Sequence, residues 1–109
     1  MNLSEFGTQV ANIHAQLRTA AQTLRQQFEA SRGWAMPDSV EGAIASALTA
    51  IDASIAKLAP GGSITARVLS GEKSAAWWDA AAAVPRESLA YVARPMGEAL
   101  PSWQRIRGE

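Results

Sequence analysis

The segment SAAWWDAAAAVPRESLAYVARP, residues 74–95, holds the most distinctive side chains of this sequence. Trp77 and Trp78 are adjacent in a chain that has four tryptophans. Neighbouring side chains lie about 100° apart around a helix, so one ring can face a core while the other faces outward. Tyr91 and Trp103 lie in the same third of the chain, which also contains several arginines: Arg67, Arg86, Arg94, Arg105 and Arg107.

Three roles are open for these aromatic residues. Trp, Tyr and Arg are enriched at the hot spots of protein interfaces. The same residue types can stack a nucleobase and hold a phosphate. The rings can also supply core volume that alanine cannot. The first role gives a set of predicted partner-binding residues: Trp34, Trp77, Trp78, Arg94 and Trp103.

Trp34 belongs to the segment RGWAMPD, which reads as a loop. A loop tryptophan either folds back onto the ends of neighbouring helices or is offered to a partner.

Residue types that perform catalysis are sparse. The single histidine, His14, has no second histidine with which to share a metal, and a surface position is its ordinary interpretation, with a pH switch or a catalytic base as the alternatives. The chain has no cysteine, which excludes disulfides, thiol nucleophiles, zinc fingers and iron–sulfur sites. No serine lies in a nucleophile-elbow pattern.

The remaining polar motifs favour structural roles. Gly61-Gly62 lacks the lysine and the spacing of a phosphate-binding loop and reads as a helix terminator. Asp79 and Glu87 could meet in space, although solvated carboxylates are the default interpretation. We therefore expect a binding protein rather than an enzyme, with no catalytic residue, metal or cofactor.

The charge balance restricts the class of partner. Basic and acidic residues number ten each, so the formal net charge is zero. A neutral chain is not expected to bind duplex nucleic acid or anionic membranes through general electrostatics. The N-terminus does not resemble a secretory signal, and no run approaches the roughly 18 apolar residues of a membrane span. We expect a cytoplasmic protein from a bacterium or its phage.

Residues 5–32 carry a seven-residue repeat that predicts a long helix. One set of seam positions is Leu3, Val10, Leu17 and Leu24. The complementary set is Phe6, Ile13 and Ala20, with Phe28 following one place late. This a/d pattern is typical of a helix that packs along its whole length. Ser4 is the expected N-cap and Gly33 the expected stop.

Residues 39–59 predict a second helix, antiparallel to the first. Asp38 and Glu41 have capping-box spacing, and Pro60-Gly61-Gly62 ends the pattern. Large apolar residues recur at spacings of three or four: Val40, Ile44, Leu48, Ile51, Ile55 and Leu58. Because the connection to the first helix is short, we expect an antiparallel helical hairpin.

The rest of the chain is less regular. Residues 61–73 form a predicted linker, in which SITARVL suits a short strand, an extended segment or a further helix. We expect a helix over 74–84, with Ser74 as its cap, and a fourth helix that begins at Pro85. Pro95, Gly97 and Pro101 then predict an irregular tail. The whole is an all-α single domain over residues 1–109, with the hairpin in 1–60 and the short helices and tail in 74–109.

A helical hairpin with a tryptophan at its bend resembles the small secreted WXG-type proteins. Their motif is Trp-any-Gly, whereas the order here is Gly33-Trp34, and the later tryptophans lie outside that pattern. Residues 10–59 also resemble the helical core of phage proteins that sequester cyclic-nucleotide signals, without a diagnostic motif.

The expected function is that of a small protein-binding module. It would dock on a larger bacterial protein, as an accessory or inhibitor protein of a phage or mobile element. The alternative is an oligomeric protein that binds or sequesters a small nucleotide signal. The thin, alanine-rich core also predicts a homo-oligomer, most simply a dimer, because association buries further area.

Overall fold

The computed structural model describes residues 2–31 and 37–107, and in residues 95–107 it describes the helical backbone alone. These residues form helices α1 (Leu3–Ser31), α2 (Asp38–Lys57), α3 (Ser63–Leu69) and α4 (Ala75–Arg107), and no strand occurs among them. The expected all-α fold and its antiparallel hairpin are confirmed.

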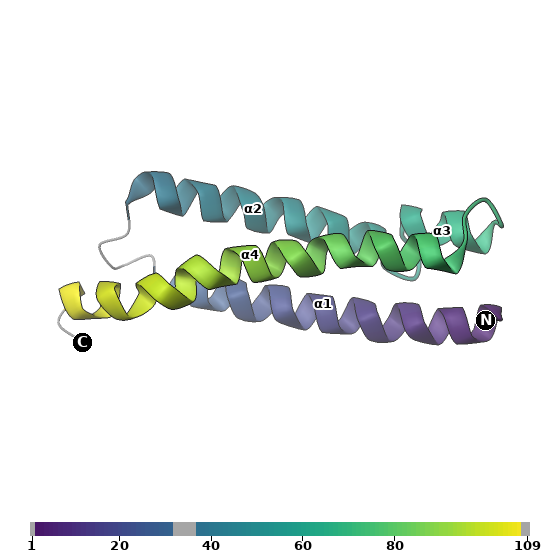
Figure 1. Cartoon of the computed structure of the whole chain (residues 1–109), viewed down its shortest axis with the longest axis horizontal. Coiled ribbons are helices and arrows are strands. Elements are labelled where there is room, and N and C mark those ends of the chain that lie inside the picture. The colour runs from purple at the N-terminus through teal and green to yellow at the C-terminus, as the bar shows by residue number, and fades with distance from the viewer. Residues whose placement is uncertain (1, 32–36, 108–109) are drawn as a thin grey trace.

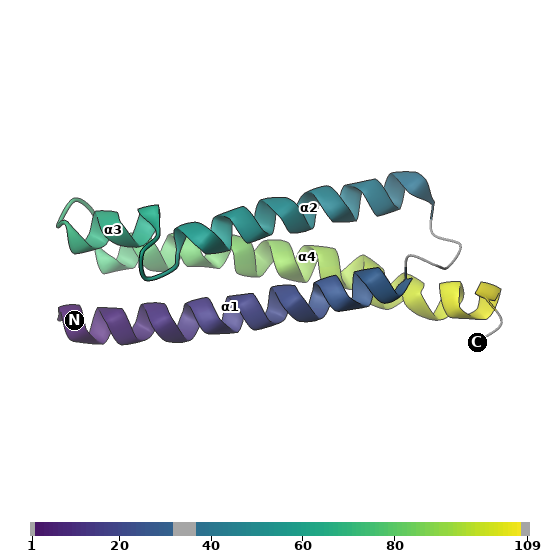
Figure 2. The same cartoon turned by 180° about the vertical axis from the view of Figure 1, so that it is seen from behind.

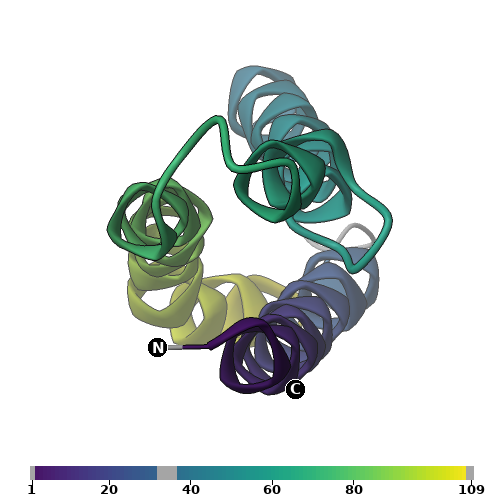
Figure 3. The same ribbon diagram turned by 90° about the vertical axis from the view of Figure 1, so that its right-hand side faces the viewer.

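Helices α1, α2 and α4 pack side by side as an elongated three-helix bundle that measures 55 × 21 × 18 Å. Viewed along the bundle, the three helices stand at the corners of a triangle (Figure 3). Helix α2 runs antiparallel to both α1 and α4, and α3 covers the end of the bundle near the N-terminus (Figures 1 and 2). Each long helix therefore has two neighbours, and each contributes one apolar stripe to a shared core.

Helix α1 begins at Leu3, and its N-cap lies two residues before the expected cap, Ser4. The side chain of Asn2 accepts a hydrogen bond from the backbone N–H of Glu5 at 2.8 Å, and Glu5 accepts one in return from the Asn2 N–H at 3.3 Å. This reciprocal pair is a capping box, so Asn2 and not Ser4 is the N-cap. The expected stop, Gly33, lies outside the described residues.

The buried seam of α1 follows the expected heptad only in part. Val10, Leu17 and Leu24 are buried as expected, whereas Leu3 is 66% exposed. In the complementary set Ala21 is buried in place of Ala20, and Phe28 lies seven residues after it. A straight helix has 3.6 residues per turn and drifts against a 3.5-residue repeat, so the seam moves by one position halfway along.

Helix α2 turns its large side chains inward and its small ones outward. The buried residues are Ile44, Leu48, Ile51 and Ile55. Pro37 is the N-cap, and its carbonyl accepts the N–H groups of Val40 and Glu41. Asp38 is thus the first helical residue and not the cap, and its carboxylate stands in the first turn, where the helix dipole favours negative charge.

The turn between α2 and α3 depends on a glycine. A Cβ added to Gly62 would lie 2.3 Å from the carbonyl oxygen of Lys57, closer than any real contact. The segment SITARVL that follows is helix α3 and not a strand or an extended linker. A second turn after α3 uses Gly71 at φ +82°, which lies in the left-handed region.

Residues 75–107 form one continuous helix where the sequence predicted two short helices and an irregular tail. Ser74 caps it as expected, with its hydroxyl accepting the Trp77 N–H at 3.2 Å. Proline inside a helix costs about 3 kcal/mol. The helix continues through Pro85 because its buried stripe stays in register across it: Trp78, Ala82, Pro85, Leu89 and Val92. Burying side chains such as Leu and Val contributes about 1.5–3 kcal/mol each, which offsets the cost.

Candidate functional site

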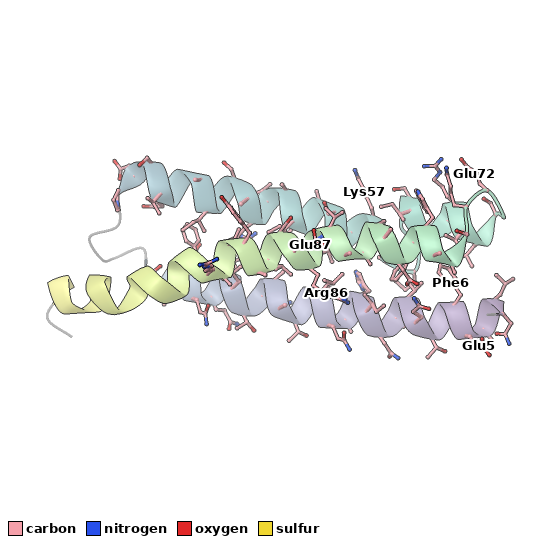
Figure 4. All side chains as sticks on the ribbon, in the orientation of Figure 1. Glu5, Phe6, Lys57, Glu72, Arg86 and Glu87 are labelled. Atoms are coloured by element: carbon pink, nitrogen blue, oxygen red, sulfur yellow. The ribbon has the colours of Figure 1, made fainter. Side chains whose placement is uncertain are left out.

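The tryptophan pair of α4 is divided between core and surface. Trp78 is 0% exposed, and its ring meets that of Phe6 edge-on, with 5.8 Å between centroids. Figure 4 shows Phe6 on α1 directed toward α4. Burial at this level makes Trp78 a structural residue, so a partner cannot reach it in this conformation.

The indole of Trp78 is held by a buried polar relay. Its N–H donates to the hydroxyl oxygen of Thr65 at 2.9 Å, and that hydroxyl donates to the carbonyl of Leu58 at 3.0 Å. Thr65 is itself buried. The relay joins α4, α3 and the end of α2, and it satisfies polar atoms whose burial would otherwise cost free energy.

Trp77 is half-buried, and its ring is covered by cations of the same chain. The guanidinium carbon of Arg67 lies 5.1 Å from the ring centroid, and the Lys73 ammonium lies 5.5 Å from it. Arg67 also donates to Glu72 at 2.6 Å, and this hydrogen bond lowers the pKa of the Glu72 carboxyl. The arrangement braces the turn between α3 and α4, so Trp77 is not an open stacking platform for a nucleobase.

The other predicted contact residues do not gather around this pair. Arg94 is exposed on α4, seventeen residues beyond Trp77, which corresponds to about 25 Å along a helix axis. The side chain of Trp103 and the whole of Trp34 lie outside the described residues. Within the described part of the chain, the predicted residues therefore form no single site.

An apolar groove between α2 and α4 is the feature that the sequence interpretation missed. Its two adjoining sections have volumes of about 490 and 290 Å³ and share Ala47, Tyr91 and Val92. We call this feature the α2–α4 groove. Its lining from α2 is Ser39, Val40, Ala43, Ile44, Ala47, Ala50, Ile51 and Ser54, and from α4 it is Pro85, Glu87, Ser88, Tyr91 and Val92.

Tyr91 stands at the edge of this groove with 81% of its surface exposed. On the same side of α4, Val84 is 57% exposed one heptad earlier. The available signal was the spacing of small residues on α2, since Ala43, Ala47 and Ala50 recur every three or four positions and leave a channel beside the stripe.

A second groove, between α1 and α2, mixes polar and apolar side chains. It has a volume of about 470 Å³, and its lining includes His14, Arg18, Gln22, Arg25 and Asp52. Arg25 is already paired with Asp52 across the two helices. Burial and the neighbouring Arg18 guanidinium lower the pKa of His14 below its ordinary value.

The carboxylates of Asp79 and Glu87, which the sequence left free to pair, lie far apart in the structure. Asp79 and Glu87 are eight residues apart on the continuous helix α4, about 12 Å along its axis. Asp79 instead accepts a hydrogen bond from Gln9 of α1. Among the described residues, no group of three or more His, Cys, Asp or Glu side chains is placed to hold a metal ion.

Helix α2 is long and apolar enough to cross a membrane by length and composition, with a mean hydropathy of 1.2. The core helix of a soluble protein passes the same test. Ile44, Leu48, Ile51 and Ile55 are buried in the core, while the exposed positions are mostly alanine, serine and threonine. Buried residues make up 22% of that apolar window, so packing within the bundle accounts for only part of the composition of α2.

Comparison with known proteins adds no assignment, because the chain matches no family model, no curated protein and no solved structure at a significant level.

Proposed function

We propose that this chain is a small non-enzymatic protein-binding module whose contact surface is the α2–α4 groove. The observation that carries the proposal is Tyr91, which is 81% exposed beside a groove of apolar lining. Tyr91 and the apolar lining beside it form one contiguous exposed patch, and contiguous apolar patches mark interaction sites where single exposed residues do not.

The groove has the composition of an interface centre. Most of its lining residues are apolar, and a few polar side chains, such as those of Ser39 and Ser88, lie among them. Tyrosine is among the residues that dominate binding energy, and a buried hot-spot residue contributes on the order of 2 kcal/mol or more. Val40 at the α2 rim and Val84 on α4 extend the exposed apolar surface on both sides.

The proposed partner is a protein, and the proposed setting is the bacterial cytoplasm. An accessory or inhibitor protein of a phage or mobile element would work by this kind of docking. Trp34, Arg94 and Trp103 remain predicted contacts of the partner. Trp77 is a weaker candidate, because Arg67 and Lys73 already cover its ring.

The proposal is tested by placing a photo-crosslinking amino acid at position 91 and, as a matched control, at exposed Ala53, which lies on α2 outside the groove. Crosslinks formed at 91 and not at 53 identify the partner by mass spectrometry. The affinity of that partner for Tyr91→Ser should then fall at least tenfold at an unchanged melting temperature. Equal crosslinking at both positions, or unchanged affinity, would contradict the proposal.

Binding of a nucleotide signal is the second candidate. The observation that favours it is the placement of His14 and Arg18 along the α1–α2 groove, where an arginine can hold a phosphate. Titration of a nucleotide panel while the His14 ring is followed by NMR tests it. A bound phosphate would raise the pKa of His14, and Arg18→Gln should abolish that rise.

A further inference from the structure

We propose that the α1–α2 groove binds the phosphate group of a small phosphate ester between Arg18 and His14, and that His14 takes up a proton as this anion binds. The inference rests on the second candidate function, because it takes this groove to be a ligand site. It deepens that candidate by naming the group that is recognised, the part of the ligand that lies beside it, and the coupling of binding to pH.

The two side chains form one set of donors on α1. His14 and Arg18 both line the groove and are four residues apart, a spacing at which helical side chains are neighbours, with about 5–6 Å between Cβ atoms. A guanidinium presents five N–H donors in a planar fork, and an imidazolium adds two. The oxygens of one phosphate can accept hydrogen bonds from both groups, and such charge-assisted bonds are stronger than neutral ones.

Arg18 is exposed, and its charge is not neutralised by the protein. Within the described part of the chain, no ion pair or hydrogen bond joins its guanidinium to a carboxylate. Arg25, two turns further along α1, differs because Asp52 of α2 lies 2.5 Å from it. An anion that enters the groove therefore meets an open cation at Arg18 and displaces no carboxylate from it.

The electrostatic surroundings of His14 favour an added negative charge. The charged side chains that line the groove with it are Arg18 and Arg25 of α1 and Asp52 of α2, and no residue of α4 belongs to this lining. Burial and the Arg18 guanidinium lower the pKa of the imidazole below its ordinary value. An anion between the two groups opposes the effect of the guanidinium and accepts a hydrogen bond from the imidazolium, so binding raises this pKa.

The coupling between proton and anion has a fixed sign. An anion that raises the pKa of His14 binds more tightly to the protonated form, so its affinity rises as the pH falls through the pKa values of the bound and the free protein. A rise of one pKa unit corresponds to about a tenfold gain in affinity. Because the pKa of the free protein lies below 6.5, the affinity should be greater at pH 5 than at pH 8.

The rest of the lining favours a phosphate ester over the free anion. Ala21 and Ile55 are buried, and Ala56 and Ala59 continue the apolar surface beside them. The groove volume of about 470 Å³ lies in the range of small-molecule sites and exceeds what one phosphate fills. Gln22 adds an amide donor and acceptor. An apolar or planar group attached to the phosphate can therefore lie on this surface.

NMR titration of the full, ¹⁵N-labelled chain tests the coupling. The backbone amide signals of α1 report the affinity, and the ring signals report the pKa of His14 without overlap, because the chain has one histidine. The probe is sulfate, which stays a dianion at both pH 5 and pH 8, at constant ionic strength. It should bind about tenfold more tightly at pH 5.

Three variants assign the effect to the two side chains. His14→Gln should remove the difference in sulfate affinity between pH 5 and pH 8. Arg18→Gln should weaken sulfate binding about tenfold at pH 5. The matched control is Arg86→Gln, an exposed arginine of α4 outside the groove, which should bind sulfate like the wild type.

The class of ligand is tested by comparing phenyl phosphate with inorganic phosphate at one pH. Phenyl phosphate should bind about threefold more tightly or better, because its ring covers the apolar lining. Equal affinity would overturn the ester. Phosphatidylcholine vesicles that contain phosphatidic acid carry the same group on a lipid surface. Binding to these vesicles without binding of phenyl phosphate would overturn the small-molecule ligand.

Sulfate binding that is equally tight at pH 5 and pH 8, or that Arg18→Gln leaves unchanged, would overturn the inference. If nucleotides still bind in the groove in that case, the second candidate function stands without the coupling. If neither sulfate, phenyl phosphate nor a nucleotide binds at either pH, the inference and the second candidate both fail, while the protein contact proposed for the α2–α4 groove is unaffected.

Discussion

At the scale of single residues, Trp77 and Trp78 are adjacent in the sequence but have different environments in the structure. The 100° step of a helix sends one ring into the core and leaves the other at the surface, as the sequence predicts. The sequence could not show which ring is buried, because that depends on Phe6 of α1 and Thr65 of α3. Tyr91 was missed for the same reason, since its exposure follows from where α2 lies beside α4.

The relay from Trp78 through Thr65 should contribute more to the free energy of unfolding than one exposed hydrogen bond does. Thr65→Val keeps the shape but leaves the indole N–H and the Leu58 carbonyl buried without this partner, which costs about 1–3 kcal/mol. Urea unfolding should show this loss, with a change in tryptophan fluorescence. Thr49→Val is the matched control, because the exposed Thr49 hydroxyl bonds only within its own helix, and it should change stability by less than about 0.5 kcal/mol. Equal losses in the two variants would show that the buried relay stabilises the protein no more than an exposed threonine hydrogen bond does.

His14 gives the stability of the folded chain a pH dependence of known sign. Its pKa is lowered on folding, by burial and by Arg18, from the ordinary value of 6.5. The unfolded chain therefore takes up this proton first, and stability present above pH 6.5 declines as the pH falls through and below that value. Melting temperatures at pH 7.5 and pH 5.5 should differ less in His14→Gln than in the wild type. An identical difference in both proteins would assign the effect to other groups.

At the scale of helices, the sequence predicted α1 and α2 closely because each has one unbroken apolar stripe. It divided α4 at Pro85 because local propensity treats an internal proline as a break. The helix is continuous in the structure because Trp78, Leu89 and Val92 lie on one stripe, and burial of that stripe in the bundle stabilises it. The caps at Asn2 and Pro37 were likewise displaced by one or two positions, since several polar residues near a helix start can serve and packing selects among them.

Two glycines of the α2 region should respond to alanine in opposite directions. Gly42 lies inside α2 with nothing near the position of a Cβ, so Gly42→Ala should stabilise the protein by about 0.5–1 kcal/mol. Gly62→Ala would drive a methyl group into the Lys57 carbonyl and should destabilise it. Thermal and urea unfolding measure both. A stabilising Gly62→Ala would mean that the turn between α2 and α3 can relax away from this contact.

At the scale of the whole molecule, the bundle is long and thin. Three helices share a single column of large side chains, and alanine fills much of the remaining contact. Domains of this size are stable by only about 5–15 kcal/mol, so further burial between copies is a substantial addition. The sequence suggested this shortage of core, but only the packed helices show that an uncovered apolar surface lies between α2 and α4.

Association through the α2–α4 groove should therefore appear in unfolding as well as in mass. If the folded chain dimerises and the unfolded chain does not, the melting temperature depends on protein concentration by mass action. For a chain of this length, a tenfold increase above the dissociation constant should raise the wild-type melting temperature by about 2–5 °C. Ala50→Glu places a charge in the lining of the α2–α4 groove and should melt at the same temperature at every concentration, while Ala53→Glu, outside that lining, should follow the wild type. Calorimetry with reversible rescans measures this and separates dimerisation from aggregation, which lowers the apparent midpoint as concentration rises. A wild-type midpoint that does not move with concentration would mean that the groove stays open to water in the folded protein, with Tyr91 free for a different partner.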